Sequence, residues 1–306
     1  MAIPDFQKLM LPLLDFSRDQ LPHTLAEARK HLANIYSLSN EDLNELLPSG
    51  KQKRFDNRVA WAKQYLGMAG LLDSPKRGSF SISSEGMKFL ETKPKSISIS
   101  TLDQFPKFRA FREGSKTDPL FTDTSSDKIE TITETPEELL EKSFNQIQNE
   151  LALSLLNQLK NCTSSYFENI VVMLLEKMGY GKYRKDAGKT TGKTGDEGID
   201  GVINEDRLGL ELLYIQAKCW KDITVGRPEI QKFVGALHGK RARKGVFITT
   251  STFSNDAKKY VALIDPRVVL IDGIQLAFLM IEHGLGVSVK TTMELKKIDS
   301  DFFIED

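Results

Sequence analysis

The stretch from Gly195 to Lys218, GDEGIDGVINEDRLGLELLYIQAK, sets the architecture of the second half of the chain. It predicts two apolar strands joined by a polar turn over residues 204–207, with Asp200 at the start of the first strand. Gln216 and Lys218 end the second strand, and side chains two residues apart on a strand project from the same face. If the strands pair through the turn, Asp200 meets Gln216 and Lys218 at one edge of a sheet.

These residue types are the ones that a magnesium-dependent phosphodiester hydrolase needs. Mg²⁺ prefers hard oxygen ligands, and one or two protein carboxylates with a substrate phosphate complete its site. Asp200 is the main candidate ligand, and the amide oxygen of Gln216 or the carbonyl of Ala217 is a second. Lys218 would orient the attacking water or stabilise charge on the phosphate oxygens. An acid before a strand and a lysine after one are also common at solvated sheet edges, so the spacing alone leaves both interpretations open.

The composition is that of a globular protein with about two domains. The chain has 306 residues, of which 40% are hydrophobic and 27% are charged. Because no apolar run approaches the roughly 18 residues of a spanning helix and the N-terminus lacks a signal pattern, we expect a cytoplasmic protein without a membrane partner. Cys162 and Cys219 form no CxxC pair and the four histidines show no ligand spacing, so zinc chemistry and disulfides are not expected.

Charge is segregated although the formal net charge is zero. Between Lys51 and Phe80 seven basic residues accompany two acidic ones, whereas between Glu113 and Glu150 ten acidic residues accompany three lysines. The first segment can bind phosphate and the second cannot.

Residues 1–91 are predicted to form a small, mainly helical domain with a hairpin. Helical periodicity covers residues 3–16, a second helix follows the cap Thr24, and a short third piece begins at Asn40. A further helix runs over about residues 53–68 before a basic turn at 73–78. Helices followed by a hairpin with a basic tip resemble a winged helix, which binds DNA. The expected DNA contacts are Lys53, Arg54, Asn57, Arg58 and Lys63 on the helix and Lys76 and Arg77 at the tip. The alternative is a surface helix with solvated charges, or a winged helix used for protein contacts.

Residues 92–135 are rich in Ser, Thr, Pro, Lys and Asp, which predicts a polar linker. Phe105, Phe108, Phe111 and Phe121 indicate that part of this linker is packed. Residues 136–160 follow as an amphipathic connecting helix, whose apolar stripe would join the domains or pair subunits, with core packing as the default interpretation.

Residues 161–306 alternate helices and strands. This order predicts a mixed α/β sheet covered by helices on both faces. A helix over about residues 164–178 contains Glu168, which the sheet would bring near Asp200. After the hairpin, we expect three residues to face a DNA cleft or to brace the site, with surface packing as the alternative: Arg227, Glu229 and Gln231.

The segment Ala187-Gly-Lys-Thr-Thr-Gly-Lys-Thr194 has the spacing of a relaxed phosphate loop. A true phosphate loop follows a buried strand and opens a helix, but basic residues precede this segment and glycines follow it. We therefore expect a basic loop, including Lys189 and Lys193, that follows a DNA backbone. Asp196 in the same region is the alternative to Asp200 as metal ligand.

The motifs together resemble the Mrr family of restriction endonucleases. The C-terminal resemblance rests on Ser-Tyr-Phe-Glu168, Gly195-Asp-Glu-Gly-Ile-Asp200-Gly, Gln216-Ala-Lys218, Val225-Gly-Arg-Pro-Glu and Gly245-Val-Phe-Ile-Thr-Thr-Ser. The N-terminal resemblance rests on Asn57-Arg-Val-Ala-Trp61, Ala69-Gly-Leu-Leu and Arg77-Gly, which are similar to the winged-helix domain of that family. The resemblance implies an α/β restriction-endonuclease-like core of the PD-(D/E)xK superfamily and a type IV, modification-dependent enzyme that cuts methylated DNA with Mg²⁺.

Carried over by residue, the resemblance makes Asp200 the metal ligand, Lys218 the catalytic lysine, Glu168 the helix acid that assists the metal, and Gln216 the residue at the acid-or-glutamine place. The chain departs from the superfamily pattern at the neutral Gln216 and at Ile199, which stands where the pattern has proline. A second hypothesis is a DNA-binding regulator with an inactive nuclease fold, whose signature would be loss of an acid or the lysine. Since duplex cleavage needs two active centres, a homodimer or larger assembly is expected.

Overall fold

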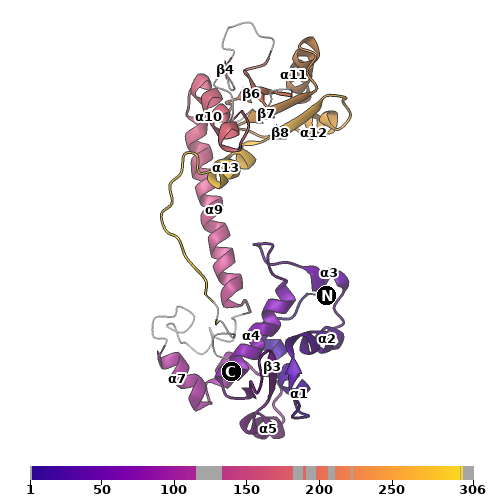
Figure 1. The fold of residues 1–306 in the computed structure, drawn as a ribbon, viewed down its shortest axis with the longest axis vertical. Coiled ribbons are helices and arrows are strands. Elements are labelled where there is room, and N and C mark those ends of the chain that lie inside the picture. The colour runs from indigo at the N-terminus through magenta and orange to yellow at the C-terminus, as the bar shows by residue number, and fades with distance from the viewer. Residues whose placement is uncertain are drawn as a thin grey trace, which may run out of the picture. The chain divides into compact units, whose positions relative to one another are not determined.

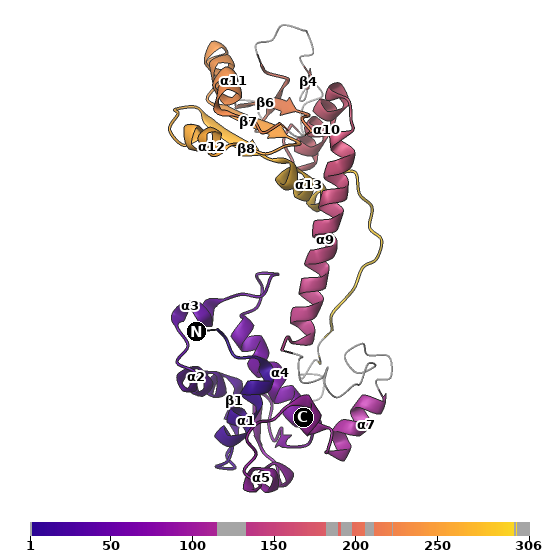
Figure 2. The same cartoon turned by 180° about the vertical axis from the view of Figure 1, so that it is seen from behind.

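The computed structural model describes residues 2–114, 133–181, 189–190, 198–205, 211–221, 223–296 and 298 (Figures 1 and 2). The chain divides into two compact units, residues 1–145 with 296–306, and residues 146–295. Among the described helices, none is both long and apolar enough to cross a membrane.

The first unit is mainly helical and contains a small antiparallel sheet. The sheet order is β1-β3-β2, and β2 pairs with β3 around the turn at residues 74–78. Its elements are α1 (Phe6–Phe16), β1 (His23–Thr24), α2 (Leu25–Ile35), α3 (Asn40–Asn44), α4 (Arg54–Met68), β2 (Leu72–Asp73), β3 (Ser79–Ile82), α5 (Ser84–Glu91), α6 (Ile99–Leu102) and α7 (Pro106–Gly114).

Local sequence signals account for several of these boundaries. Thr24 begins α2 with a reciprocal capping box, in which its hydroxyl accepts from the Glu27 backbone and the Glu27 side chain accepts from the Thr24 backbone. Gly70 follows α4 at a φ of +77°, a conformation that L side chains rarely adopt, and so ends the helix.

The packed part of the first unit extends beyond residue 91, the boundary expected from the sequence. Ile97, Leu102, Phe105 and Phe108 are buried in the same core as the residues of α1 and α4. The reason is that the apolar side chains of α6 and α7 find partners far back in the sequence, so residues 97–108 of the expected linker contribute to the core rather than spacing two domains.

The helix α9 (Pro136–Lys160) runs from the first unit into the second. Leu159 is buried in the second unit, whereas Phe144 and Ile147 are 59% and 60% exposed. The default expectation of core packing for the whole apolar stripe is therefore wrong for its middle part.

The second unit is built on a mixed sheet of order β4-β5-β6-β7-β8. The pairs β4–β5 and β5–β6 are antiparallel, and the pairs β6–β7 and β7–β8 are parallel. Its elements are α10 (Ser164–Lys177), β4 (Lys189–Thr190), β5 (Gly201–Asn204), β6 (Leu212–Lys218), α11 (Arg227–Gly239), β7 (Lys244–Thr249), α12 (Asn255–Val261), β8 (Arg267–Ile271) and α13 (Gly273–Glu282).

Helices cover both faces of this sheet, as Figure 1 shows. Val246 and Ile248 of β7 pack with α10 and α13, whereas Phe247 between them packs with α11 and α12. Successive strand residues point to opposite faces, so an unbroken apolar strand is needed where both faces are covered. The predicted mixed α/β sheet flanked by helices is confirmed.

Candidate active site

Asp200 lies immediately before β5, where the pairing of β5 with β6 fixes its position. Its backbone N–H donates to the Ile215 carbonyl at 2.8 Å, and Gly201 is in register with Ile215. Oδ2 of Asp200 accepts from the Ala217 backbone N–H at 2.8 Å and from Nε2 of Gln216. The structure thus brings together Asp200 and Gln216, which the sequence places sixteen residues apart.

Gln216 is 2% exposed, and its amide is held between Asp200 and the loop before β5. A Cβ added to Gly198 would lie 3.3 Å from Oε1 of Gln216, and Gly198 has a φ of +94°. The positive φ favours glycine at position 198, and the close approach to Oε1 leaves little room for a side chain. The positive φ could have been suspected from the glycine-rich loop that precedes the strand.

Lys218 is at the end of β6 on the same side of the strand as Gln216. Ala217 between them points into the core formed with α10 and α13. The Lys218 carbonyl accepts from Oγ1 of Thr249 at 2.8 Å and from the Thr250 N–H at 3.2 Å. These bonds tie the end of β6 to the end of β7 and so fix the backbone that positions the lysine.

Glu168 on α10 is within electrostatic range of this edge. Burial raises the pKa of the Glu168 carboxyl above its usual value, the negative charge of Asp200 raises it further, and Lys218 lowers it. A carboxyl whose pKa is raised by burial and by a neighbouring carboxylate, with a lysine nearby, is typical of a site that binds a cation or a phosphate.

The donor set fits a hard divalent cation that keeps part of its water shell. Within the described residues, no three His, Cys, Asp or Glu side chains gather closely enough to hold a metal on their own. Asp200 and Glu168 supply carboxylate oxygens, and Gln216 or the Ala217 carbonyl supplies a neutral oxygen. Mg²⁺ commonly binds through one or two carboxylates, waters and substrate phosphates, and the residues present match that pattern.

A pocket opens beside these residues, between the end of β6 and α11. It is lined by Gly198, Gln216, Lys218, Glu229, Lys232, Phe233, Gly235, Ala236 and Phe247. Of the α11 residues considered from sequence, Glu229 lines this pocket and forms an ion pair with Lys232 at 2.7 Å. Arg227 instead stacks over the Tyr260 ring at 4.9 Å, and Gln231 is exposed outside the pocket lining. Lys232 and Gly235 were missed, although their spacing from Glu229 already placed them on one side of a helix.

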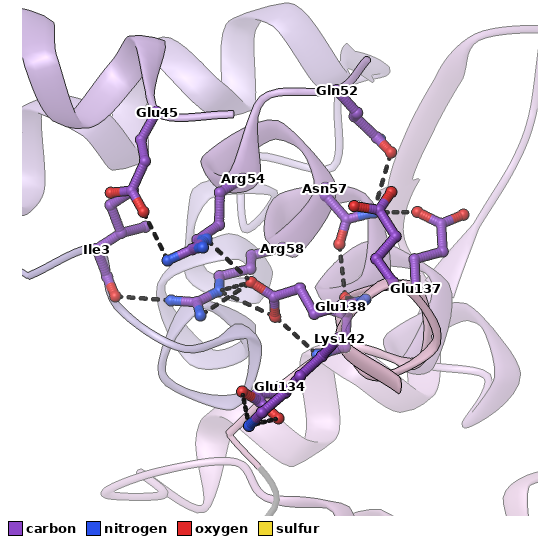
Figure 3. A network of polar contacts seen from close by, with 12 residues as sticks. Ile3, Glu45, Gln52, Arg54, Asn57, Arg58, Glu134, Glu137, Glu138 and Lys142 are labelled. Atoms are coloured by element: carbon purple, nitrogen blue, oxygen red, sulfur yellow. Dashed lines mark hydrogen bonds and ion pairs between the residues drawn. The ribbon is translucent and has the colours of Figure 1, made fainter. Parts of the chain in front are cut away.

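Three of the expected DNA contacts on α4 are engaged with the beginning of α9 (Figure 3). Asn57 is fully buried, and its amide donates to Gln52 and to Glu137. Its Oδ1 accepts from Oγ1 of Thr135 at 2.7 Å, and Thr135 also accepts from the Glu138 backbone as the cap of α9. Asn57 therefore has internal partners for its amide and is not accessible to a DNA base in this structure.

Arg58 and Arg54 are held by the same network. Nε of Arg58 donates to Glu138 at 3.0 Å and its Nη1 donates to the Ile3 carbonyl at 2.8 Å, with the Arg58 side chain only 12% exposed. Arg54 pairs with Glu45 at 2.6 Å and with Glu138 at 3.5 Å. The cations along α4 are visible in the sequence, but Glu138, which pairs with both arginines, lies about eighty residues later in the chain, beyond any local signal.

The other expected DNA contacts have different surroundings. Lys53 is exposed and donates to Asn44 at 2.8 Å, Lys63 is half-buried, and Lys76 and Arg77 are exposed on the β2–β3 turn. Lys189 belongs to β4, but its side chain lies outside the described part of the chain. Lys193 and Asp196 lie outside the described residues, as does most of the segment with phosphate-loop spacing.

Comparison with known proteins gives matches along the whole chain. A family model described as restriction endonuclease matches residues 159–280, and one described as Mrr N-terminal domain matches residues 6–92. The type IV methyl-directed restriction enzyme EcoKMrr of Escherichia coli (strain K12) is 34% identical over 308 residues, which cover 99% of this chain and 100% of that protein.

Two solved structures are similar more distantly. The DNA modification-dependent restriction endonuclease AspBHI matches with a TM-score of 0.37 and 14% identity, over 70% of this chain and 56% of that one. MspJI restriction endonuclease in complex with a 27-mer oligonucleotide matches with a TM-score of 0.27 and 19% identity, over 66% of this chain and 47% of that one.

Proposed function

Because the chain belongs to the Mrr family of restriction endonucleases, we propose that it is a Mg²⁺-dependent endonuclease that hydrolyses phosphodiester bonds in methylated duplex DNA. The observation that carries the proposal is the meeting of Asp200, Gln216 and Lys218 at one sheet edge, with Glu168 in electrostatic range. The methyl-directed activity is taken from the name of the full-length relative.

Each residue of the site has a role that follows from its contacts. In the described part of the chain, both hydrogen bonds to the Asp200 carboxylate reach Oδ2, so Oδ1 remains available to a cation. Glu168 offers a second carboxylate, and Lys218 places an ammonium group where negative charge develops on the phosphate oxygens. When bound, Mg²⁺ polarises the scissile phosphate and lowers the pKa of an attacking water.

The first unit would supply DNA binding. Helices followed by the β2–β3 hairpin have the order of a winged helix, in which the helix before the hairpin enters the major groove. The proposed phosphate contacts are Lys53 at the N-cap of α4, Lys63 on α4, and Lys76 and Arg77 on the turn. The proposed contacts do not include Arg54, Asn57 and Arg58, because their side chains bind residues at the start of α9.

Substitution of each residue tests the assignment of Asp200 and Lys218 to the active site. Asp200→Asn and Lys218→Ala are expected to lower cleavage of a methylated duplex in Mg²⁺ by at least about 100-fold, because each removes a group that stabilises the transition state. Binding of the same duplex without divalent metal, measured by fluorescence anisotropy, should stay within about threefold of the unsubstituted chain. Lys240→Gln, outside the pocket, is the control. Undiminished cleavage by both variants would refute the site.

A further inference from the structure

Gly235 is a glycine for which the fold gives no reason. It lies in the interior of α11 with an ordinary helical φ, and a Cβ placed on it would meet no described atom within 4 Å. Other glycines of this unit have clear structural causes, since a Cβ on Gly245 would lie 2.8 Å from the Phe233 ring and one on Gly273 would lie 2.6 Å from the Thr250 carbonyl. Glycine in a helix interior is less stable than alanine because it loses more backbone entropy on folding. Compared with alanine, glycine at position 235 therefore lowers the free energy of unfolding and does not improve packing.

The exposed side of α11 around Gly235 faces the candidate active site. Gly235 lines the same pocket as Gln216 and Lys218. Lys232, one helical turn earlier, lines it too, and the Lys232 side chain is 70% exposed. The pocket thus combines bare helix backbone with two lysines, one at the end of β6 and one on α11. Bare backbone permits close approach of a ligand, and two ammonium groups suit a chain of phosphates.

We propose, on the basis of the nuclease function above, that the sugar–phosphate backbone of the cleaved strand passes over Gly235 and that Lys232 contacts a phosphate next to the scissile one. The surface of α11 is then a positioning element that sets the strand against Asp200 and Lys218. The ion pair of Lys232 with Glu229 is no obstacle, because exposed ion pairs of this kind contribute little stability and exchange readily for a phosphate.

Substitution at position 235 separates this role from a packing role. Gly235→Ala is expected to raise Tm by about 1 to 3 °C and to weaken binding of a methylated duplex measured without divalent metal. Gly235→Leu should weaken binding and single-turnover cleavage by at least about tenfold, because a displaced strand is misaligned with the site. Gly239→Ala, the same change at the last residue of α11 and outside the pocket lining, is the matched control and should bind as the unsubstituted chain does. Unchanged binding and cleavage by Gly235→Leu, or a lower Tm for Gly235→Ala, would overturn the proposal.

The contact of Lys232 with phosphate has its own measurement. Lys232→Gln should reduce the slope of log K against log salt concentration by about 1, whereas Lys240→Gln, at the C-cap of α11 and outside the pocket lining, should leave the slope unchanged. Equal slopes for the two variants would contradict the contact. If the unsubstituted chain binds methylated duplex but does not cut it in Mg²⁺, the proposed nuclease activity fails, and the binding comparisons still decide the role of α11.

Discussion

At the scale of single residues, the candidate active site contains an amide hydrogen-bond donor, Gln216, directly beside the Asp200 carboxylate. Gln216 is a neutral residue at the buried strand end, and its amide donates to the Asp200 carboxylate. With an acid at this buried position, two carboxylates would be in contact without a cation. The neutral amide therefore lets the strand end form without metal, while the amide oxygen remains a ligand type that Mg²⁺ accepts.

The charge balance of the site leads to a prediction for Glu168. The raised pKa of Glu168 means that the folded state binds the proton more tightly than the unfolded state does. The stability that this carboxyl contributes is therefore greatest below its ordinary pKa of 4.5. That stability is lost as pH rises through the raised pKa. In EDTA, Glu168→Gln should therefore have a higher Tm than the unsubstituted chain at about pH 8, with the difference vanishing at about pH 4.

Thermal unfolding at both pH values measures this difference. Glu176→Gln, an exposed position on the same helix, serves as the control and should show no such pH-dependent gain. A lower Tm for Glu168→Gln at about pH 8 in EDTA would mean that the carboxylate is stabilising in the metal-free protein, contrary to this interpretation.

At the scale of elements, the start of α9 is anchored on α4 through a nearly buried ion pair. Removing one partner leaves the other charge buried and uncompensated, so Arg58→Ala should destabilise the first unit by about 3–5 kcal/mol. The exposed pair of Lys142 with Glu134 provides the matched comparison, and Lys142→Ala should cost less than about 1 kcal/mol.

Urea denaturation measures the loss of unfolding free energy in Arg58→Ala and in Lys142→Ala. Adding Glu138→Ala to Arg58→Ala completes a double-mutant cycle. The coupling energy should exceed about 1 kcal/mol, because the two side chains are in direct contact. Similar costs for Arg58→Ala and Lys142→Ala would show that the network is not an anchor.

The same elements show what could be predicted from sequence. The strands around Asp200 and Lys218 and the helix of Glu168 follow from local periodicity and turn chemistry, so the sheet edge where Asp200 meets Gln216 could be predicted from sequence. The role of Arg58 could not be predicted from sequence, because its partner Glu138 is eighty residues away and only tertiary packing brings them together. Burial of Phe105 and Phe108 in the first core likewise depends on partners outside their own segment, which looks like a linker by composition.

At the scale of the whole molecule, cutting both strands of a duplex requires two active centres. A site of this kind contains one Asp200 and one Lys218 per chain, so we expect two chains to act on one DNA. Sedimentation velocity of the inactive Lys218→Ala variant with a methylated duplex should show a complex containing two protein chains. A complex with one chain per duplex at saturating protein, together with double-strand cleavage by the unsubstituted chain, would contradict this expectation.

We propose that the Asp200–Lys218 site cuts DNA only when the DNA is methylated. The most direct test of this proposal is cleavage, in Mg²⁺, of two plasmids of identical sequence, one methylated and one unmodified. We predict that the methylated plasmid is cut at least about 100-fold faster, that EDTA abolishes cutting, and that Lys218→Ala cuts neither plasmid. Equal cutting of both plasmids, or cutting that persists in EDTA, would contradict the proposed Mg²⁺-dependent cleavage of methylated DNA.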